Sequence, residues 1–116
     1  MGNKVIHFEI ATSGDAAGLQ KFYSDAFDWK IDADNPMNYG MVDAGTAGLA
    51  GGIGPAPSDS GHVTVYIEVD DLNAALDKVE KLGGKTVTPP MDVPGGPALA
   101  HFADPSGNFI GLVKGM

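Results

Sequence analysis

The stretch HVTVYIEVDDLNAALDKVEKLGG, residues 62–84, predicts a strand that leads directly into a helix. Apolar and polar side chains alternate over residues 62–69, which is typical of a strand with one buried face. Either Asp70 or Asp71 can cap the following helix, and the glycine pair 83–84 predicts a left-handed end to it. The apolar stripe of this helix consists of Leu72, Ala75, Leu76, Val79 and Leu82.

The first half of the chain has the same order of elements. Residues 5–11 alternate, which predicts another strand with two different faces. One face carries Val5, His7 and Glu9, and the other carries Ile6, Phe8 and Ile10. Ser13 or Asp15 can cap a helix that continues through Phe27. Its apolar stripe consists of Leu19, Phe22, Tyr23 and Phe27.

Each half continues with about three further strands. In the first half these are WKIDA, YGMVDAG and GLAGGIG, and in the second half KTVT and a hairpin of residues 99–103 and 109–113 around DPSGN. The segment PAPSDSG, residues 55–61, breaks the pattern between the halves. We therefore expect an α+β fold, in one domain of residues 1–116 with modules at 1–54 and 61–116. Such modules either pack together or exchange between chains.

Composition excludes several classes of protein. The chain of 116 residues has no cysteine, which excludes disulfides, thiolate metal sites and a cysteine nucleophile. Its net charge of −8 opposes binding to nucleic acid and to anionic membranes. No signal peptide and no run of 18 apolar residues is present in the sequence, so a soluble, cytoplasmic protein is expected.

Five motifs in order resemble the vicinal oxygen chelate (VOC) superfamily, which includes glyoxalase I, bleomycin-resistance proteins and extradiol dioxygenases. They are HFEI, FYSDAFDW, GLAGGI, YIEVDDLNAALDKVEKLGG and FADPSGNFIGL. The resemblance covers nearly the whole chain. It implies paired βαβββ modules whose sheets curl as half-barrels around a cavity, and it implies a homodimer. The reaction is not fixed by the resemblance, since this fold supports many activities.

The resemblance also implies where a metal would bind. Of the four ligand positions of metal-using relatives, the first is His7 here. The second falls on Thr64, and His62 lies two residues earlier on the same face. The third falls on Gly51 or Gly52, and the fourth on Gly111. Since a divalent metal needs about three protein ligands, we expect no usual metal site and no cofactor. The alternative is a rebuilt divalent-metal site that combines His7, His62 and His101 with Glu9.

The polar faces of the strands supply the other candidate site residues. The catalytic candidates are His7, Glu9 and Glu68, because a carboxyl in a cavity with a neighbouring imidazole can transfer protons near neutral pH. The ligand-binding candidates are Trp29, Tyr39, Met41, His62, Thr64, Tyr66, His101 and Phe109. The alternative for His7 and Glu9 is a strand face in bulk water, and for Glu68 a hydrated strand end. The pair Pro89–Pro90 and the segment VPGGP, with Gly95 and Gly96, predict a loop at the cavity mouth.

Three functions are compatible with these residues. The first is a protein that binds a small, partly apolar and possibly cationic molecule without a metal. The second is a lyase, isomerase or dioxygenase acting on a small carbonyl or aromatic substrate, either metal-free or with the rebuilt metal site. The third is an accessory domain whose cavity is filled by side chains. We favour the first two over the third and hold the first slightly ahead of the second, because of the residues at positions 51, 52, 64 and 111.

Overall fold

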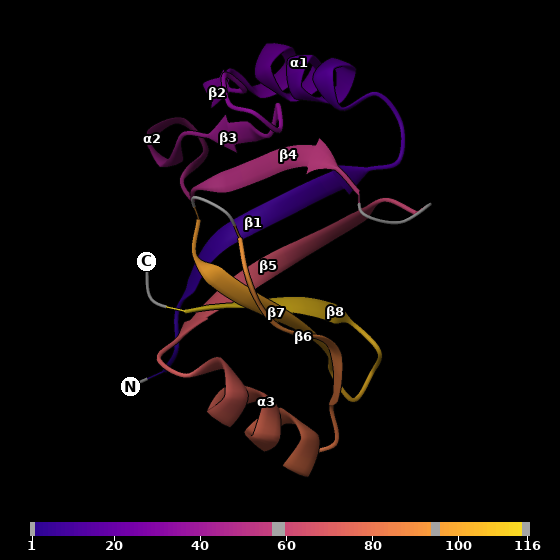
Figure 1. The fold of residues 1–116 in the computed structure, drawn as a ribbon. Coiled ribbons are helices and arrows are strands. Elements are labelled where there is room, and N and C mark those ends of the chain that lie inside the picture. The colour runs from indigo at the N-terminus through magenta and orange to yellow at the C-terminus, as the bar shows by residue number, and fades with distance from the viewer. Residues whose placement is uncertain (1, 57–59, 94–95, 115–116) are drawn as a thin grey trace. The chain divides into compact units, whose positions relative to one another are not determined.

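The computed structural model describes residues 2–56, 60–93 and 96–114 and confirms the α+β fold with a repeated strand–helix–strand order. Figure 1 shows the elements along the chain. The chain forms two compact units. We call residues 7–64 the α1 unit, and residues 1–6 with 65–116 the α3 unit.

The α1 unit contains two helices and small strands. Along the chain these elements are β1 (Val5–Thr12, from His7 on), α1 (Ala16–Phe27), β2 (Ile31–Asp32), β3 (Gly40–Val42), α2 (Ala44–Ala47) and β4 (Gly51–Pro55). The strand order is β2-β3-β4-β1, in which β1 and β4 run parallel and the other pairs antiparallel. Ala11, Val42 and Ile53 are buried in this unit. The short helix α2 lies where the sequence predicted only the end of a strand.

Helix α1 begins and ends close to where the sequence predicts. The carboxylate of Asp15 caps it by accepting a hydrogen bond from the Gly18 amide at 3.0 Å. Half of the predicted apolar stripe is wrong, because Phe22 and Phe27 are 57% and 58% exposed. The buried residue of α1 is Gln20 instead.

Gln20 is buried because the backbone beside α1 requires a donor. Its amide nitrogen donates to the carbonyl oxygens of Ile53, at 2.7 Å, and Asn38, at 3.1 Å. A buried carbonyl without a hydrogen-bond partner destabilises the folded protein. An amide side chain is therefore more stabilising here than an apolar one.

The α3 unit has one helix on one face of its strands. Its elements are β5 (His62–Val69, from Val65 on), α3 (Leu72–Lys81), β6 (Lys85–Asp92), β7 (Ala98–Ala103) and β8 (Phe109–Lys114), with strand order β5-β8-β7-β6. Its core consists of Val69, Leu72, Leu76, Ala100 and Leu112. Ile67 and Phe102 pack against this core, which confirms the predicted inward face at these positions. The prediction of one buried face for residues 62–69 is otherwise wrong, because Val63 is exposed and Tyr66, on the polar face, is buried. Figure 1 shows α3 beside β6 and β7.

The ends of α3 agree with the prediction except at Leu82. Asp71 is the cap, since its carboxylate accepts from the Ala74 amide at 3.1 Å. Gly83 has φ of +100°, the left-handed conformation expected after a helix. Leu82 is 71% exposed and does not belong to the buried stripe, because the helix ends one residue earlier.

The prediction of a loop at Pro89–Pro90 is wrong, because both prolines lie within β6. Strand β6 stands last in the strand order of its unit, and its pairing with β7 is shifted between Thr88 and Met91. Proline is tolerated at such an irregular position because its missing N–H removes no regular ladder bond. In the VPGGP loop, Pro94 and Gly95 lie outside the described residues, as do residues 57–59 of the PAPSDSG segment.

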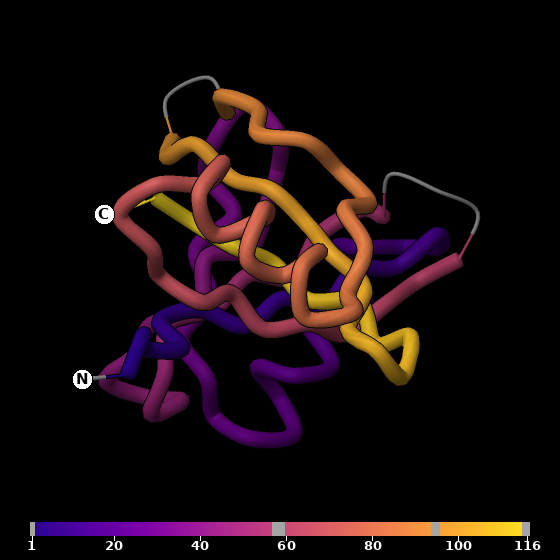
Figure 2. Tube along the Cα trace, turned by 90° about the horizontal axis from the view of Figure 1, so that it is seen from below, coloured from indigo at the N-terminus to yellow at the C-terminus, as the bar shows by residue number. Residues whose placement is uncertain are grey.

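The hairpin of β7 and β8 turns at DPSGN, as predicted. Asp104 accepts hydrogen bonds from the amides of Ser106 and Asn108, both at 2.9 Å, and Gly107 has φ of +89°. The Asn108 side chain and the neighbouring amides lower the pKa of Asp104 from its ordinary value. Figure 2 shows the chain reversing direction at this turn. Among the described residues, no helix has the length and apolar character needed to span a membrane.

Candidate functional site

Four polar side chains of the α1 unit form one hydrogen-bonded group, which we call the Glu9 cluster. Its members are His7, Glu9, Tyr39 and His62. The Tyr39 hydroxyl donates to one oxygen of Glu9 at 3.1 Å, and Nε2 of His62 lies 3.0 Å from the other oxygen. Nε2 of His7 lies 3.4 Å from the Tyr39 hydroxyl oxygen. The cluster brings together four of the residues that the sequence predicted for the site.

The direction of these hydrogen bonds follows from the single proton of the phenol. Because Tyr39 donates that proton to Glu9, its bond with His7 requires the Nε2–H of His7 as donor. The cluster is therefore a chain from one imidazole through a phenol and a carboxylate to a second imidazole.

The members of this cluster are partly buried, and burial favours the neutral form of His7. The side chains of Glu9 and His62 are only 19% and 20% exposed, and they form an ion pair when the imidazole is protonated. Burial lowers the pKa of His7 below its ordinary value of 6.5, although the charge of Glu9 opposes this shift. His7 is accordingly a neutral imidazole at neutral pH.

The loop before β3 holds Tyr39 in place. The Asn35 side chain donates to the Tyr39 carbonyl at 2.7 Å and accepts from the Tyr39 amide at 2.9 Å. Asn38 has φ of +51°, a conformation that asparagine tolerates better than most residues. The ring thus extends over β4 from a fixed backbone.

Two alternate glycines of β4 accommodate the Tyr39 ring. A Cβ at position 52 would collide with the hydroxyl end of the ring, and a Cβ at position 54 would lie 2.6 Å from its Cδ1. Gly52 pairs with Glu9 across β1 and β4, which places the phenol beside the carboxylate. Gly51 is also crowded, in this case by the ring of Phe8.

A second group, the His101 cluster, lies within the α3 unit and consists of Tyr66, His101 and Phe109. The Tyr66 hydroxyl lies 2.8 Å from Nε2 of His101. The His101 ring stacks on Phe109, with centroids 4.7 Å apart and planes 18° from parallel. A Cβ on Gly111 would collide with the ring of Tyr66, which is 6% exposed.

Three other predicted residues, Trp29, Glu68 and Thr64, have the following surroundings. Trp29 packs on Tyr23 and Phe8, on the helix side of β1, with ring centroids 5.4 and 5.6 Å apart. The Glu68 carbonyl accepts from the Asn3 side chain, and the Glu68 amide donates to the Lys4 carbonyl. Thr64 is buried.

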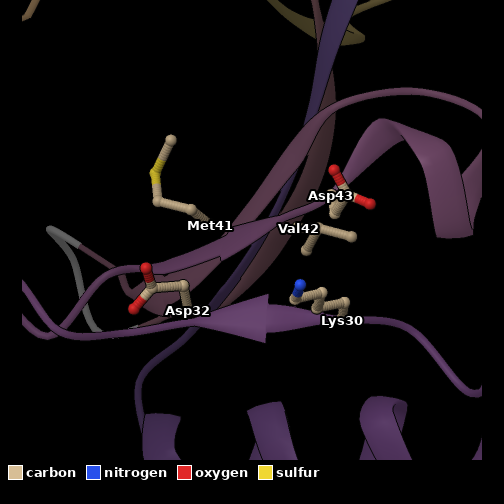
Figure 3. Close-up of a pocket in the computed structure, with 5 residues that line it drawn as sticks. All are labelled: Lys30, Asp32, Met41, Val42 and Asp43. Carbon is tan, nitrogen blue, oxygen red and sulfur yellow. The ribbon is translucent and has the colours of Figure 1, made fainter.

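Met41 is half exposed and lines a separate pocket of about 270 Å³ with Lys30, Asp32, Val42 and Asp43. Figure 3 shows Lys30 reaching toward Val42, with Asp32 and Met41 further along the strands. None of the Glu9 cluster lines this pocket. None of the predicted catalytic residues therefore contributes to the lining of this pocket.

The residues present do not fit the divalent metal that the resemblance implies. Position 52 has no side chain, and a phenol takes the space into which one would project. Position 111 is likewise covered by the Tyr66 ring. Within the described residues, no three or more histidine, aspartate or glutamate side chains are arranged to hold a metal ion.

The sequence predicted Tyr39 as a ligand-binding residue, but its hydrogen bonds to Glu9 and His7 and its packing on β4 were missed. A signal for it was present in GGIG, residues 51–54, where glycines 52 and 54 occur on the same face of a strand. A strand face without side chains often marks close approach by another group. Nothing in the sequence indicated which aromatic residue would make that approach.

Comparison with known proteins agrees with this fold. A family model described as Glyoxalase/Bleomycin resistance protein/Dioxygenase superfamily matches residues 4–112. The chain belongs to this superfamily.

The similarity to individual proteins is moderate and covers only part of the relative described next. A Mycobacterium tuberculosis protein named "Putative glyoxylase CFP32" is 33% identical over 107 residues, which cover 84% of this chain and 41% of that protein. The chain thus spans about two fifths of the length of this relative.

Two solved structures share the fold. A hypothetical protein, BH1468 from Bacillus halodurans, has a TM-score of 0.73 at 16% identity and covers 100% of this chain and 96% of its own. Methylmalonyl-CoA epimerase from Mycobacterium tuberculosis has a TM-score of 0.68 at 16% identity, with 97% and 87% covered. At this identity the similarity concerns the fold alone.

Proposed function

We propose that this chain binds a small, partly apolar, positively charged molecule at the Glu9 cluster, without a divalent metal. The observation that carries the proposal is the Glu9 carboxylate, which is 19% exposed and held by Tyr39 and His62. A carboxylate of low exposure attracts a cation more strongly than one in bulk water, because the local dielectric is lower. The net charge of −8 favours the approach of the same ligands.

His7 and Tyr39 are compatible with a cationic, partly apolar ligand at the Glu9 cluster. Burial keeps His7 neutral, so it does not repel a cation. The Tyr39 ring offers an apolar surface next to the carboxylate, which suits a molecule with an aromatic body and an ammonium group.

A fluorescent aromatic amine tests the proposal. Daunorubicin combines a planar, fluorescent aromatic ring system with one ammonium group, so its fluorescence can be followed as protein is added. We expect saturable binding of one molecule per chain, with the compound recovered unchanged. Glu9→Gln should weaken binding by about 10-fold or more, since the charge-assisted contact is lost.

Glu80→Gln is the matched control, because Glu80 lies on α3 and the substitution removes the same charge. Long-range attraction alone predicts equal loss from both variants. Equal loss, or no saturable binding by the wild-type protein, would reject the proposal.

The hydrogen-bonded chain of the Glu9 cluster favours a second candidate, a metal-free lyase or isomerase. His7 or Glu9 would move a proton at a carbon next to a carbonyl group. Proton exchange of hydroxyacetone in D₂O, followed by NMR, measures this chemistry directly. The enzyme candidate predicts exchange that His7→Ala abolishes, whereas exchange at the buffer rate contradicts it for this probe class.

A further inference from the structure

Each unit combines a glycine, a tyrosine and a histidine in a similar arrangement. Gly52 lies on β4 and Gly111 on β8, the last strand of each strand–helix–strand repeat. In each unit, a tyrosine ring fills the space next to the glycine, and its hydroxyl lies within hydrogen-bond distance of a histidine. The same three residue types thus recur in two units whose sequences differ.

The geometry in the α1 unit identifies what the phenol replaces. The Tyr39 hydroxyl occupies the space that a side chain at position 52 would enter. It lies 3.4 Å from Nε2 of His7 and 3.1 Å from Glu9. A metal-ligating oxygen at that point would therefore form a set of three protein ligands with His7 and Glu9. Three protein ligands are the number found in catalytic zinc sites.

We infer that Tyr39 and Gly52 are a matched pair, and that the phenol is what keeps a divalent cation out of the Glu9 cluster. A protonated phenol is a hydrogen-bond donor and a poor ligand for a divalent ion. The ring also fixes the imidazole and the carboxylate as its own hydrogen-bond partners. Tyr39 is thus a specificity-determining residue that selects hydrogen bonding in place of chelation.

The inference rests on the metal-free part of the proposed function, but it is independent of which organic ligand binds. In the α3 unit the pair Tyr66 and Gly111 has the same relation, with His101 as the imidazole at 2.8 Å. The α3 unit differs in that the ring, rather than the hydroxyl, lies closest to the glycine. The recurrence supports an exchange of ligand type and argues against an accidental loss of one side chain.

Two sets of variants test the inference. The first is a stability cycle of Gly52→Ala, Tyr39→Ala and the double variant, with Gly14→Ala as control because Gly14 lies in an open turn. We expect Gly52→Ala to lower the Tm by about 5 °C or more through overpacking. The double variant should have a Tm no lower than that of Tyr39→Ala alone. Additive losses would overturn the matched pair.

The second set measures Zn²⁺ binding by calorimetry after chelator treatment. The wild-type protein should show no stoichiometric Zn²⁺ binding. The combination of Tyr39→Ala and Gly52→Glu should bind one Zn²⁺ at least about 100-fold more tightly than Tyr39→Ala alone. Adding His7→Ala to the combination should abolish that gain.

The outcomes separate the two proposals. Stoichiometric Zn²⁺ on the wild-type protein that is lost in His7→Ala would overturn the inference, as would a folded Tyr39→Ala, Gly52→Glu protein with no gain. If circular dichroism shows that this combination is unfolded, the stability cycle and the wild-type titration decide. Failure of daunorubicin to bind would reject the proposed function and leave these results unaffected.

Discussion

Single residues decide the chemistry of this chain more than its regular elements do. Tyr39 connects His7 with Glu9, and Gln20 satisfies two carbonyls beside α1. Gln20 is buried and Tyr39 is partly buried, and a hydropathy pattern does not reveal the hydrogen-bond partners of either. The sequence predicted His7, Glu9 and His62 because strand alternation placed the first two on one face and the resemblance marked that face as the site.

The titration of His7 makes stability depend on pH. Burial lowers its pKa in the folded protein below the ordinary value of 6.5, so the unfolded chain binds more protons at mildly acidic pH. The contribution of neutral His7 to folding is therefore fully present above pH 6.5 and is lost as the pH falls below it. We expect denaturant unfolding at pH 5 to show lower stability than at pH 7.5.

His7→Gln separates this effect from that of other groups. The variant lacks the titrating imidazole, so its stability should change less between the two pH values than that of the wild-type protein. His62 and His101 remain in both proteins and cancel in the difference. An unchanged pH dependence would show that His7 has the same pKa in both states.

At the scale of elements, local signals predicted most of the fold and failed where tertiary context decides. The caps at Asp15 and Asp71 and the hairpin turn at DPSGN follow from side chains close in sequence. Phe22 and Phe27 fit an apolar stripe but are exposed, because α1 presents Gln20 to its unit instead. The two prolines of β6 read as a loop, since the irregular pairing that tolerates them depends on β7.

The junction of α1 with β4 leads to a stability prediction. Gln20→Leu removes the donor to the Ile53 and Asn38 carbonyls and leaves an apolar side chain against them. We expect a loss of about 1–3 kcal/mol in the free energy of unfolding, measured with urea.

Lys21→Ala on the same helix is the control, because the Lys21–Asp25 ion pair is exposed. This control should change the free energy of unfolding much less than Gln20→Leu does, because water screens an exposed ion pair. Equal effects of Gln20→Leu and Lys21→Ala would show that the buried amide contributes nothing beyond helix propensity.

At the scale of the whole molecule, the duplicated order of elements was readable because each half carries its own strand, cap and apolar helix face. Each unit then has its own core and its own imidazole–phenol pair. The modules predicted at 1–54 and 61–116 remain a description of the sequence repeat, whereas the compact units divide at residues 6–7 and 64–65. Chain contacts of that kind cannot be inferred from periodicity.

The family resemblance predicts a homodimer. Light scattering after gel filtration should give a mass about twice the 11.9 kDa of one chain. If the protein has the mass of one chain at all concentrations up to the millimolar range, this prediction is contradicted.

The packing of the Tyr39 ring against Gly52 and Gly54 also constrains the order in which substitutions can occur at these positions. Any first replacement at position 52 or 54 collides with the ring already present. A replacement at either glycine should therefore destabilise the protein less once position 39 carries a smaller residue. An acidic residue at position 52 should therefore be accommodated only in variants whose aromatic residue at position 39 has already been replaced.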